Sequence, residues 1–402
     1  MKFKCLYAVV MDTYRHKELD CLLINDTAKV SINNIFSSQW ELYKYNHCFE
    51  LREVEVVEVE KMLRCFDKKN GYMIYQCTEC YEEKTIHFNC NSRICSRCGK
   101  LHADEWARNL KRRLFKVDHR HVVMTIAEEL RPFFDEDRKL LKTLMDCAIK
   151  SIRDTMSYDA TARRHRKTTV IPGIIVVLHT YGRDLGFNPH IHVIMSEGGF
   201  DQNKEWVNIP YISYTALRKT WQYQVLTNLK KQIPDTKENK QLIDRLFKKN
   251  ANGFYVRAKD KITSFEVIRY IGRYVRHPAI ANSRIVDYDG ETVTFWYERD
   301  KKRLYKTMSV EDFITAIIGH IPDKQFKIIR YYGAYSRHKR KVLDGILHLI
   351  SMIQSKLNDF TSKISKRQIK CPNCGCNMKI VECVIPPPTT NWPIIPEITR
   401  WM

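Results

Sequence analysis

Apolar residues recur every three or four positions in several stretches of the chain, and this spacing predicts helices with one buried face. The predicted helices lie at residues 101–116, 139–156, 212–231, 264–276, 311–321 and 338–360. Ser309 and Asp312, three positions apart, add the start signal of a helix to one of these stretches. Helices are therefore expected through much of the second half of the chain.

Short continuous apolar runs predict buried strands. They lie at residues 121–126, 170–179 and 190–195. The last two runs flank a segment rich in glycine, aspartate, asparagine and proline, so an antiparallel hairpin is expected there. Residues 283–288 and 292–299 flank Asp289-Gly290 and predict a second hairpin. Strands before, between and after helices predict an α+β fold with an antiparallel sheet.

Changes in composition divide the chain into four expected regions. Residues 1–60 have no assigned role, and residues 61–116 form a cysteine-rich module. Residues 117–345 hold the predicted sheet, and residues 346–402 combine a basic helix, a second cysteine cluster and a proline-rich tail. No stretch reaches the roughly 18 apolar residues of a membrane span, and the beginning of the chain lacks the apolar run of a signal peptide. The expectation is a cytoplasmic protein with no membrane partner.

The net charge of the chain is +22, and the basic residues are clustered. Clusters lie at residues 111–113, 163–167, 301–303 and 337–341. Surfaces of this charge attract polyanions, and nucleic acid is the commonest such partner because phosphate contacts release counterions. A generally lysine-rich protein is the alternative, but clustering favours nucleic acid.

The chain holds 14 cysteines and no export signal, which argues against a disulfide framework. Cys77-x2-Cys80 and Cys95-x2-Cys98 are two knuckles separated by fourteen residues, a spacing that suits one tetrahedral Zn²⁺. Cys65 and Cys90, with His87, are surplus candidates. They could replace a ligand, form part of a second site or stay free. A closed site of four cysteines is structural and leaves no coordination position for chemistry.

A second group of cysteines lies near the far end of the chain. Cys371-Pro-Asn-Cys374-Gly resembles a zinc-ribbon knuckle, with Cys376 and Cys383 as further thiols. The second knuckle is irregular, so zinc binding and unligated cysteines are both open here.

Two histidines stand two positions apart in a predicted strand, His190-Ile191-His192. Alternate side chains of a strand share one face, so both imidazoles can hold one ion. His179 ends the partner strand and is the first choice for a third ligand, with Glu266 as the fallback. In a chain with 14 histidines such a triplet alone is a weak motif. The similar triplet at residues 119–121 is interpreted as coincidental.

Tyr270 and Tyr274 are four positions apart in a predicted helix, so their hydroxyls share one face. Tyrosine is a weak nucleophile because its pKa is about 10. A divalent ion on a phosphate and nearby cations such as Arg269, Arg273 and Arg276 would make attack feasible. The alternative is a pair of aromatic side chains that pack the helix against a sheet.

Several longer segments occur together in a fixed order: CNSRICSRCG at 90–99, HRHVVMTI at 119–126, EELRP at 128–132, LHTYGRDLGFNPHIHVIM at 178–195, YIGRYVRHPAIANSRI at 270–285 and RYYG at 330–333. With these segments the chain resembles the two-tyrosine HUH transposases of rolling-circle insertion sequences, over roughly residues 62–345. The resemblance implies an HUH-type antiparallel sheet flanked by helices, an N-terminal zinc module that contacts DNA, and a candidate C-terminal zinc ribbon.

The resemblance also implies roles for individual residues. His190 and His192 hold Mg²⁺ or Mn²⁺, and Tyr270 and Tyr274 become joined to the 5′ side of a nick in single-stranded DNA at the element ends and target. The third ligand is not carried over. Two alternatives use the same features: a replication initiator with the same nuclease, and a zinc DNA-binding protein without catalysis.

Overall fold

The computed structural model describes residues 30–65, 67–111, 114–115, 117–164, 169–209, 211–258, 279–336 and 369–385. The predicted helix at 264–276 and the predicted basic helix at 338–360 lie outside these residues. Tyr270, Tyr274, Arg273, Arg276 and Glu266 are therefore not placed.

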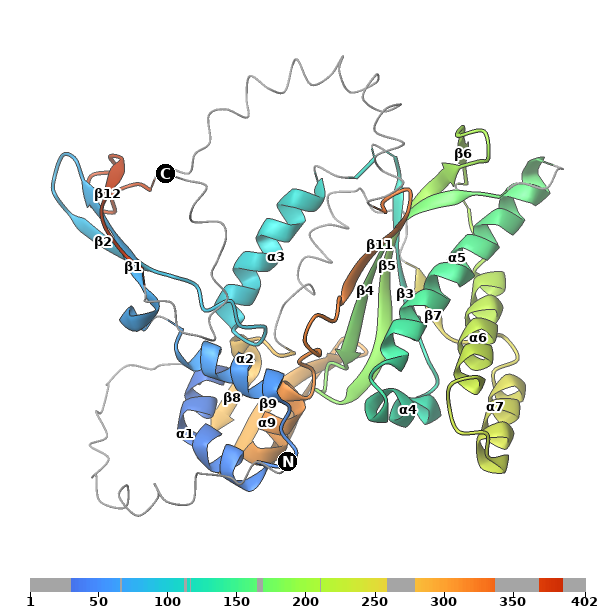
Figure 1. Ribbon diagram of the computed structural model, residues 1–402, viewed down its shortest axis with the longest axis horizontal. Coiled ribbons are helices and arrows are strands. Elements are labelled where there is room, and N and C mark those ends of the chain that lie inside the picture. Colours follow the sequence, from blue (N-terminus) through green and yellow to red (C-terminus); the bar gives the residue numbers. More distant parts are fainter. Residues whose placement is uncertain are drawn as a thin grey trace, which may run out of the picture.

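A sheet of antiparallel strands forms the centre of the molecule (Figure 1). Its strands are β3 (His119–Thr125), β4 (Ile171–Tyr181), β5 (Phe187–Phe200), β6 (Trp206–Asn208), β7 (Val256–Ala258) and β11 (Ile329–Gly333). Their order is β11-β4-β5-β3-β7, with β6 paired to β5. The hairpin expected from the apolar runs is confirmed as β4 and β5, and the mixed helix and antiparallel sheet architecture confirms the α+β fold.

Helices cover one face of this sheet (Figure 1). They are α4 (Arg131–Glu136), which follows the short turn η4 (Glu128–Leu130), α5 (Leu140–Arg164), α6 (Tyr214–Lys230) and α7 (Lys237–Lys249). Val193 and Met195 of β5 pack with Ile152 and Trp221 in the largest apolar core. The Trp221 indole also donates a hydrogen bond to the Thr125 carbonyl, 2.7 Å away. This face of the sheet is therefore structural.

Helix α3 (Ser96–Lys111) covers part of the other face. Its Leu110 is buried with Ile175, Val177 and Ile194 of the sheet, and Trp106 packs beside them. The helix begins inside the second cysteine knuckle, five residues before the predicted start at residue 101, so Cys98 lies in its first turn. The cysteine-rich module is thus connected directly to the sheet.

A second apolar core joins the beginning of the described chain to residues 279–321. Its elements are α1 (Ile32–Asn46), α2 (Glu53–Leu63), η5 (Asn282–Arg284), β8 (Ile285–Tyr288), β9 (Thr292–Arg299), β10 (Lys302–Ser309) and α9 (Val310–Ile318). The second predicted hairpin is confirmed as β8 and β9. Ser309 caps α9 by accepting a hydrogen bond from the Asp312 backbone N–H, as predicted.

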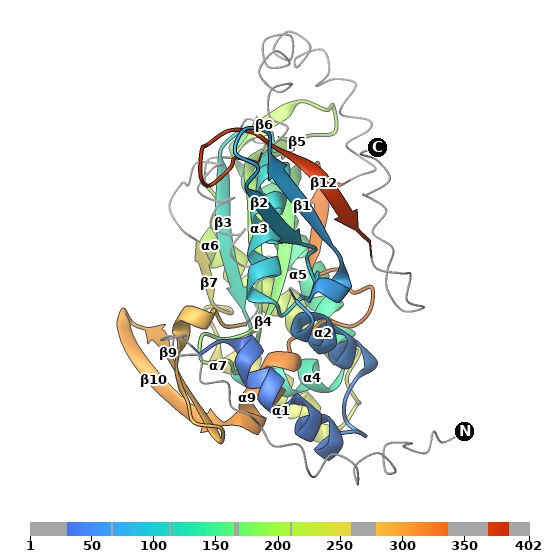
Figure 2. The same ribbon diagram turned by 90° about the vertical axis from the view of Figure 1, so that its left-hand side faces the viewer.

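A small three-stranded sheet projects from the rest of the molecule (Figure 1), and Figure 2 shows its strands side by side, in front of the central sheet. It consists of β1 (Tyr72–Cys77), which follows the turn η3 (Lys68–Asn70), β2 (Glu83–His87) and β12 (Met378–Val384). β12 comes from the far end of the chain and pairs with β1 in antiparallel register. Across the described parts of the chain, no helix combines the length and apolar character needed to span a bilayer.

Candidate metal sites and their surroundings

Three histidines meet on adjacent strands of the central sheet. His179 of β4 is the register partner of His190 of β5, and His192 lies two residues further along β5 on the same face. One ring nitrogen from each of the three lies within 4.8 Å of the others. His179 and His192 are 4% and 5% exposed, so the ion-binding nitrogens would lie largely away from bulk water. The structure therefore brings together the histidine pair and the residue chosen from hairpin geometry.

The His190 ring is oriented by its own backbone. Its Nδ1 lies 2.7 Å from the Asn188 carbonyl oxygen, and because a carbonyl can only accept, Nδ1 carries the proton. Burial lowers the pKa of His190, with a smaller contribution from the charge of Arg131. The neutral ring then presents Nε2 as a lone-pair donor, which is the form that binds a metal ion.

The His192 ring is oriented by another histidine. Its Nδ1 lies 2.9 Å from His121 Nε2, and the two rings are stacked with centroids 5.2 Å apart. His121 belongs to the triplet interpreted from the sequence as coincidental. Neither histidine of that triplet belongs to the three-histidine group. His121 nevertheless contacts His192, which is a member of the group, so the sequence interpretation missed a neighbour of the site. Only the pairing of β3 with β5 places it there, and the sequence does not give that pairing.

His119, the other histidine of the triplet, has a different neighbour. It is fully buried, and its Nε2 lies 2.6 Å from the Tyr335 hydroxyl. That hydroxyl also accepts a hydrogen bond from the Phe115 backbone N–H, at 3.2 Å. His119 therefore belongs to the packing between β3 and the segment after β11.

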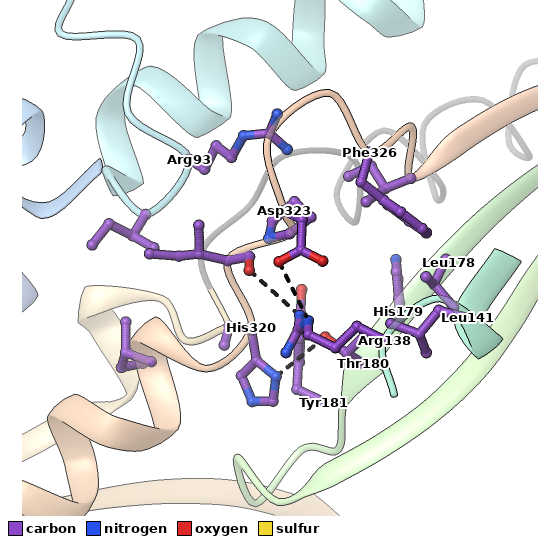
Figure 3. Close-up of a pocket in the computed structure, with 16 residues that line it drawn as sticks. Arg93, Arg138, Leu141, Leu178, His179, Thr180, Tyr181, His320, Asp323 and Phe326 are labelled. Carbon is purple, nitrogen blue, oxygen red and sulfur yellow. Dashed lines mark hydrogen bonds and ion pairs between the residues drawn. The ribbon is translucent and has the colours of Figure 1, made fainter. Parts of the chain in front are cut away.

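A cavity of about 70 Å³ lies beside His179 (Figure 3). Its walls combine the cysteine-rich module, the end of β4 and the segment after α9; among the labelled side chains are Arg93, Arg138, Thr180, Tyr181, His320 and Asp323. The Arg138 guanidinium donates to the Gly319 carbonyl at 2.9 Å. Burial lowers the pKa of His320 to about 4, so this ring is neutral at neutral pH. Next to the histidine group, the cavity is thus lined by the cysteine-rich module, the central sheet with its helices, and the second core.

The cysteines of the N-terminal module fall into two separate groups. Cys65, Cys90, Cys95 and Cys98, hereafter the buried cluster, have sulfur–sulfur distances of 3.9 Å for Cys65–Cys98, 3.4 Å for Cys90–Cys98 and 3.7 Å for Cys65–Cys95. The loop that carries Cys90 is fastened to α2, because the Arg93 backbone N–H donates to the Glu58 carboxylate at 2.7 Å. This cluster is part of the second apolar core.

The other group joins the β1–β2 hairpin to the C-terminal end of the described chain. Cys77, Cys80, Cys371 and Cys374, hereafter the split cluster, have sulfur–sulfur distances of 3.4 Å for Cys77–Cys374, 3.5 Å for Cys80–Cys371 and 3.5 Å for Cys80–Cys374. The expectation that the Cys77 and Cys95 knuckles share one ion is therefore wrong. The five steps along β1 from Tyr72, at about 3.3 Å each, carry Cys77 about 17 Å from the base of the hairpin, whereas Cys95 and Cys98 follow the end of β2 at that base.

The geometry of both clusters fits structural zinc. Zn–S bonds of about 2.3 Å in a tetrahedron place sulfur atoms about 3.8 Å apart, close to the distances seen in both clusters. Hydrogen bonds from the Cys80 and Glu79 backbone lower the pKa of Cys77 to about 6. Hydrogen bonds from Cys90 and Cys95 lower the pKa of Cys65 to about 7, whereas the pKa of Cys90 is raised. Four thiolates this close would need a cation between them, and Zn²⁺ would supply it.

Two known protein families each match a different part of the chain. Residues 35–126 match a family described as "Transposase zinc-binding domain", and residues 173–342 match one described as "Putative transposase". The first match contains the buried cluster and the β1–β2 hairpin, and the second contains the three histidines. The class is therefore a transposase with a zinc-binding module.

Curated relatives narrow this class. The transposase for insertion sequence element IS801 of Pseudomonas savastanoi pv. phaseolicola is 31% identical over 326 residues, which cover 73% of this chain and 74% of the relative. The "Putative transposase y4qJ" of Sinorhizobium fredii (strain NBRC 101917 / NGR234) is 24% identical over 377 residues, covering 85% of this chain and 92% of the relative. The chain belongs to the IS91/IS801 family of insertion-sequence transposases. No solved structure matches it.

Proposed function

We propose that this transposase nicks and rejoins single-stranded DNA at the ends of its element through a 5′-phosphotyrosine intermediate, as in rolling-circle transposition. The observation that carries the proposal is the group of His179, His190 and His192 on two paired strands. Tyr270 and Tyr274 are the proposed nucleophiles, with Arg273 and Arg276 beside the phosphate. Family membership supports DNA as the substrate, and the net charge of +22 agrees with it.

The three imidazoles form a donor set for one divalent cation, Mg²⁺ or Mn²⁺. Three protein ligands do not complete a coordination shell, so an ion held there would remain open to water and phosphate oxygens. A bound ion would neutralise charge on the scissile phosphate and make its phosphorus easier to attack. Mg²⁺ strongly prefers oxygen ligands, so of these two ions Mn²⁺ suits a set of three nitrogens better.

The tyrosines carry out the cleavage and rejoining steps. One tyrosine phenolate attacks phosphorus, the bond from phosphorus to the 3′ oxygen breaks, and the leaving strand takes up a proton to become a free 3′-OH. The new phosphotyrosine bond keeps the energy of the phosphodiester, so attack by a 3′-OH reverses the step without ATP. A second tyrosine permits a second cleavage while the first strand end is still bound.

Proposals for the four regions of the chain follow from this chemistry. Residues 117–345 act as the nuclease, and residues 61–116 as a zinc-containing module that contacts DNA. Residues 346–402 add a basic segment, and residues 1–60 have no proposed role beyond the packing of α1 and α2 in the second core. A cytoplasmic location, where cellular DNA is accessible, goes with the proposed reaction.

The test uses the purified full-length chain, Mn²⁺ or Mg²⁺ and single-stranded oligonucleotides from the element ends. A covalent adduct that survives SDS is expected. The Tyr270→Phe/Tyr274→Phe double variant should lose it, and His190→Ala should lose cleavage with a smaller change in DNA affinity. An adduct that persists in the double variant overturns the assignment of the nucleophiles, and its absence in the unaltered chain favours a DNA-binding role without catalysis.

His121→Ala tests the histidine that orients a proposed ligand. Loss of such a partner lowers metal affinity about 10- to 100-fold, and Mn²⁺ titration of the variant should show a loss in this range. His119→Ala is the matched control, because it removes an equally buried imidazole from the same strand that contacts Tyr335 instead. Equal Mn²⁺ affinity in the two variants would contradict the positioning role.

A further inference from the structure

We propose that the split cluster is a zinc site assembled from two segments far apart in the sequence, in which one ion joins the segment that leads into β12 to the β1–β2 hairpin. Cys77 and Cys80 lie within the part of the chain that matches the zinc-binding family, but Cys371 and Cys374 lie outside both matched regions. The chain would therefore hold two zinc ions, one in each cluster, and the second depends on a segment beyond the transposase match.

The four thiols of the split cluster converge on one point. Cys80 Sγ lies 3.5 Å from both Cys371 Sγ and Cys374 Sγ, and Cys77 Sγ lies 3.4 Å from Cys374 Sγ. Each half contributes two thiols with the two-residue spacing of a zinc knuckle. Two thiols do not complete a tetrahedral set, so neither half forms a closed site without the other.

The backbone of both halves is shaped for a shared ion. In the C-terminal half the Gly375 N–H donates to the Cys371 carbonyl at 3.0 Å, and Gly375 has φ +73°, a conformation that favours glycine. In the N-terminal half the Cys77 N–H donates to the Glu82 carbonyl at 2.9 Å. Both turns place their cysteines toward the other half, as the sulfur–sulfur distances between the halves show.

Strand pairing holds the two halves together but leaves little core. β12 pairs with β1 from Tyr72 opposite Val384 to Cys77 opposite Met378. Among the residues that the structure describes, the buried members of the local apolar cluster are Cys77, Cys371 and Met378. A core this small does not stabilise a three-stranded sheet on its own, and metal ligation commonly replaces it in such modules. The ion is therefore the main stabilising element of this sheet.

Zinc content of the full-length chain tests the proposal, because a shared site makes the losses non-additive. Two zinc ions per chain are expected after dialysis of the unaltered protein. Cys77→Ser/Cys80→Ser and Cys371→Ser/Cys374→Ser should each retain one, and the variant with all four substitutions should also retain one. The control Cys376→Ser/Cys383→Ser should retain two, since neither thiol belongs to the cluster.

Alkylation of the native protein gives a second measurement that does not depend on substitutions. Cys80, Cys374 and Cys383 are all exposed. Ligation predicts that Cys383 reacts rapidly, whereas Cys80 and Cys374 react only after a chelator removes the ion. In the Cys371→Ser/Cys374→Ser variant, Cys77 and Cys80 should become reactive while Cys90 and Cys98 stay protected; reactive Cys90 and Cys98 would instead identify a misfolded variant.

Three results would overturn the split site. A variant with all four substitutions that holds fewer ions than each pair would show two separate sites. Rapid alkylation of Cys80 and Cys374 in the untreated protein would show that no ion is bound there. A disulfide between Cys77 and Cys374, seen by mass spectrometry of non-reduced peptides, would replace the ion with a covalent bond.

Discussion

The buried cluster and the split cluster each consist of four cysteines, but their surroundings are opposite. The buried cluster collects its ligands within 33 positions of the sequence and lies in an apolar core with α1, α2 and α9. The split cluster spans 297 positions and has almost no core of its own. The first is built into the body of the molecule, and the second fastens a projecting sheet. The same metal chemistry therefore has different consequences for stability in the two places.

Loss of the buried cluster should have the largest effect. Cys98→Ser removes a fully buried ligand from the first turn of α3. Structural zinc contributes about 10 kcal/mol or more to the folding of small zinc domains, so a fall of more than about 5 kcal/mol in unfolding free energy is expected, together with loss of DNA cleavage. Denaturant unfolding measures the fall. Cys48→Ser, at an exposed cysteine, is the control, and equal stability of the two variants would contradict the core role of this cluster.

Loss of the contact between α3 and the sheet should have the second-largest effect on stability. Leu110 is 2% exposed between the helix and the strands that carry the histidines. Leu110→Ala should lower the unfolding free energy by about 3 kcal/mol, the usual loss for a buried leucine. Leu101→Ala on the same helix is the control, because Leu101 is 42% exposed. If both variants lose the same stability, α3 does not connect the buried cluster to the histidine face.

Loss of the split cluster should be felt only locally. In Cys371→Ser/Cys374→Ser we expect amide hydrogen exchange to become fast in β12 and faster in β1, because local sheets open independently of the main core. The unfolding free energy of the central sheet should change by less than about 1 kcal/mol. A large fall in global stability would remove the distinction between the two clusters.

The smallest effect is expected at a buried cysteine outside both clusters. Cys147 of α5 is 4% exposed, its thiol lies 3.3 Å from the Gln224 carbonyl, and burial raises its pKa to about 12. Because the reactive species is the thiolate, raising the pH from 7 to 9 should leave alkylation of Cys147 negligible in the folded protein, with or without chelator. Mass spectrometry of labelled peptides measures this, and labelling of Cys147 on chelation alone would show that metal loss unfolds the main core.

Local patterns predicted the local structure well. The β4–β5 hairpin, the β8–β9 hairpin and the Ser309 cap follow from residues close together in sequence, and the structure contains all three. The meeting of His179 with His190 also followed from hairpin pairing, since the two are register partners. The predicted start of α3 was five residues too late, because the first turn of the helix contains a cysteine knuckle that apolar spacing does not detect.

Long-range neighbours were not predictable in the same way. Cysteine spacing shows which thiols can bind zinc, but the rigid reach of β1 decides that Cys77 meets Cys374 and not Cys98. His121 lies near His192 because β3 pairs with β5, and many strand orders are compatible with the same apolar runs. The sequence thus showed which cysteines and histidines can bind a metal ion, whereas the pairing of the strands decides which of them meet.

The separation of the two halves of the split cluster also has a consequence for synthesis. Cys80 and Cys371 are 291 positions apart. At the usual 5–20 residues per second, a ribosome makes the second half about 15 to 60 s after the first. During that interval Cys77 and Cys80 are an incomplete pair, and a product truncated anywhere before Cys371 never completes it. The finished sheet therefore shows that translation has passed β12.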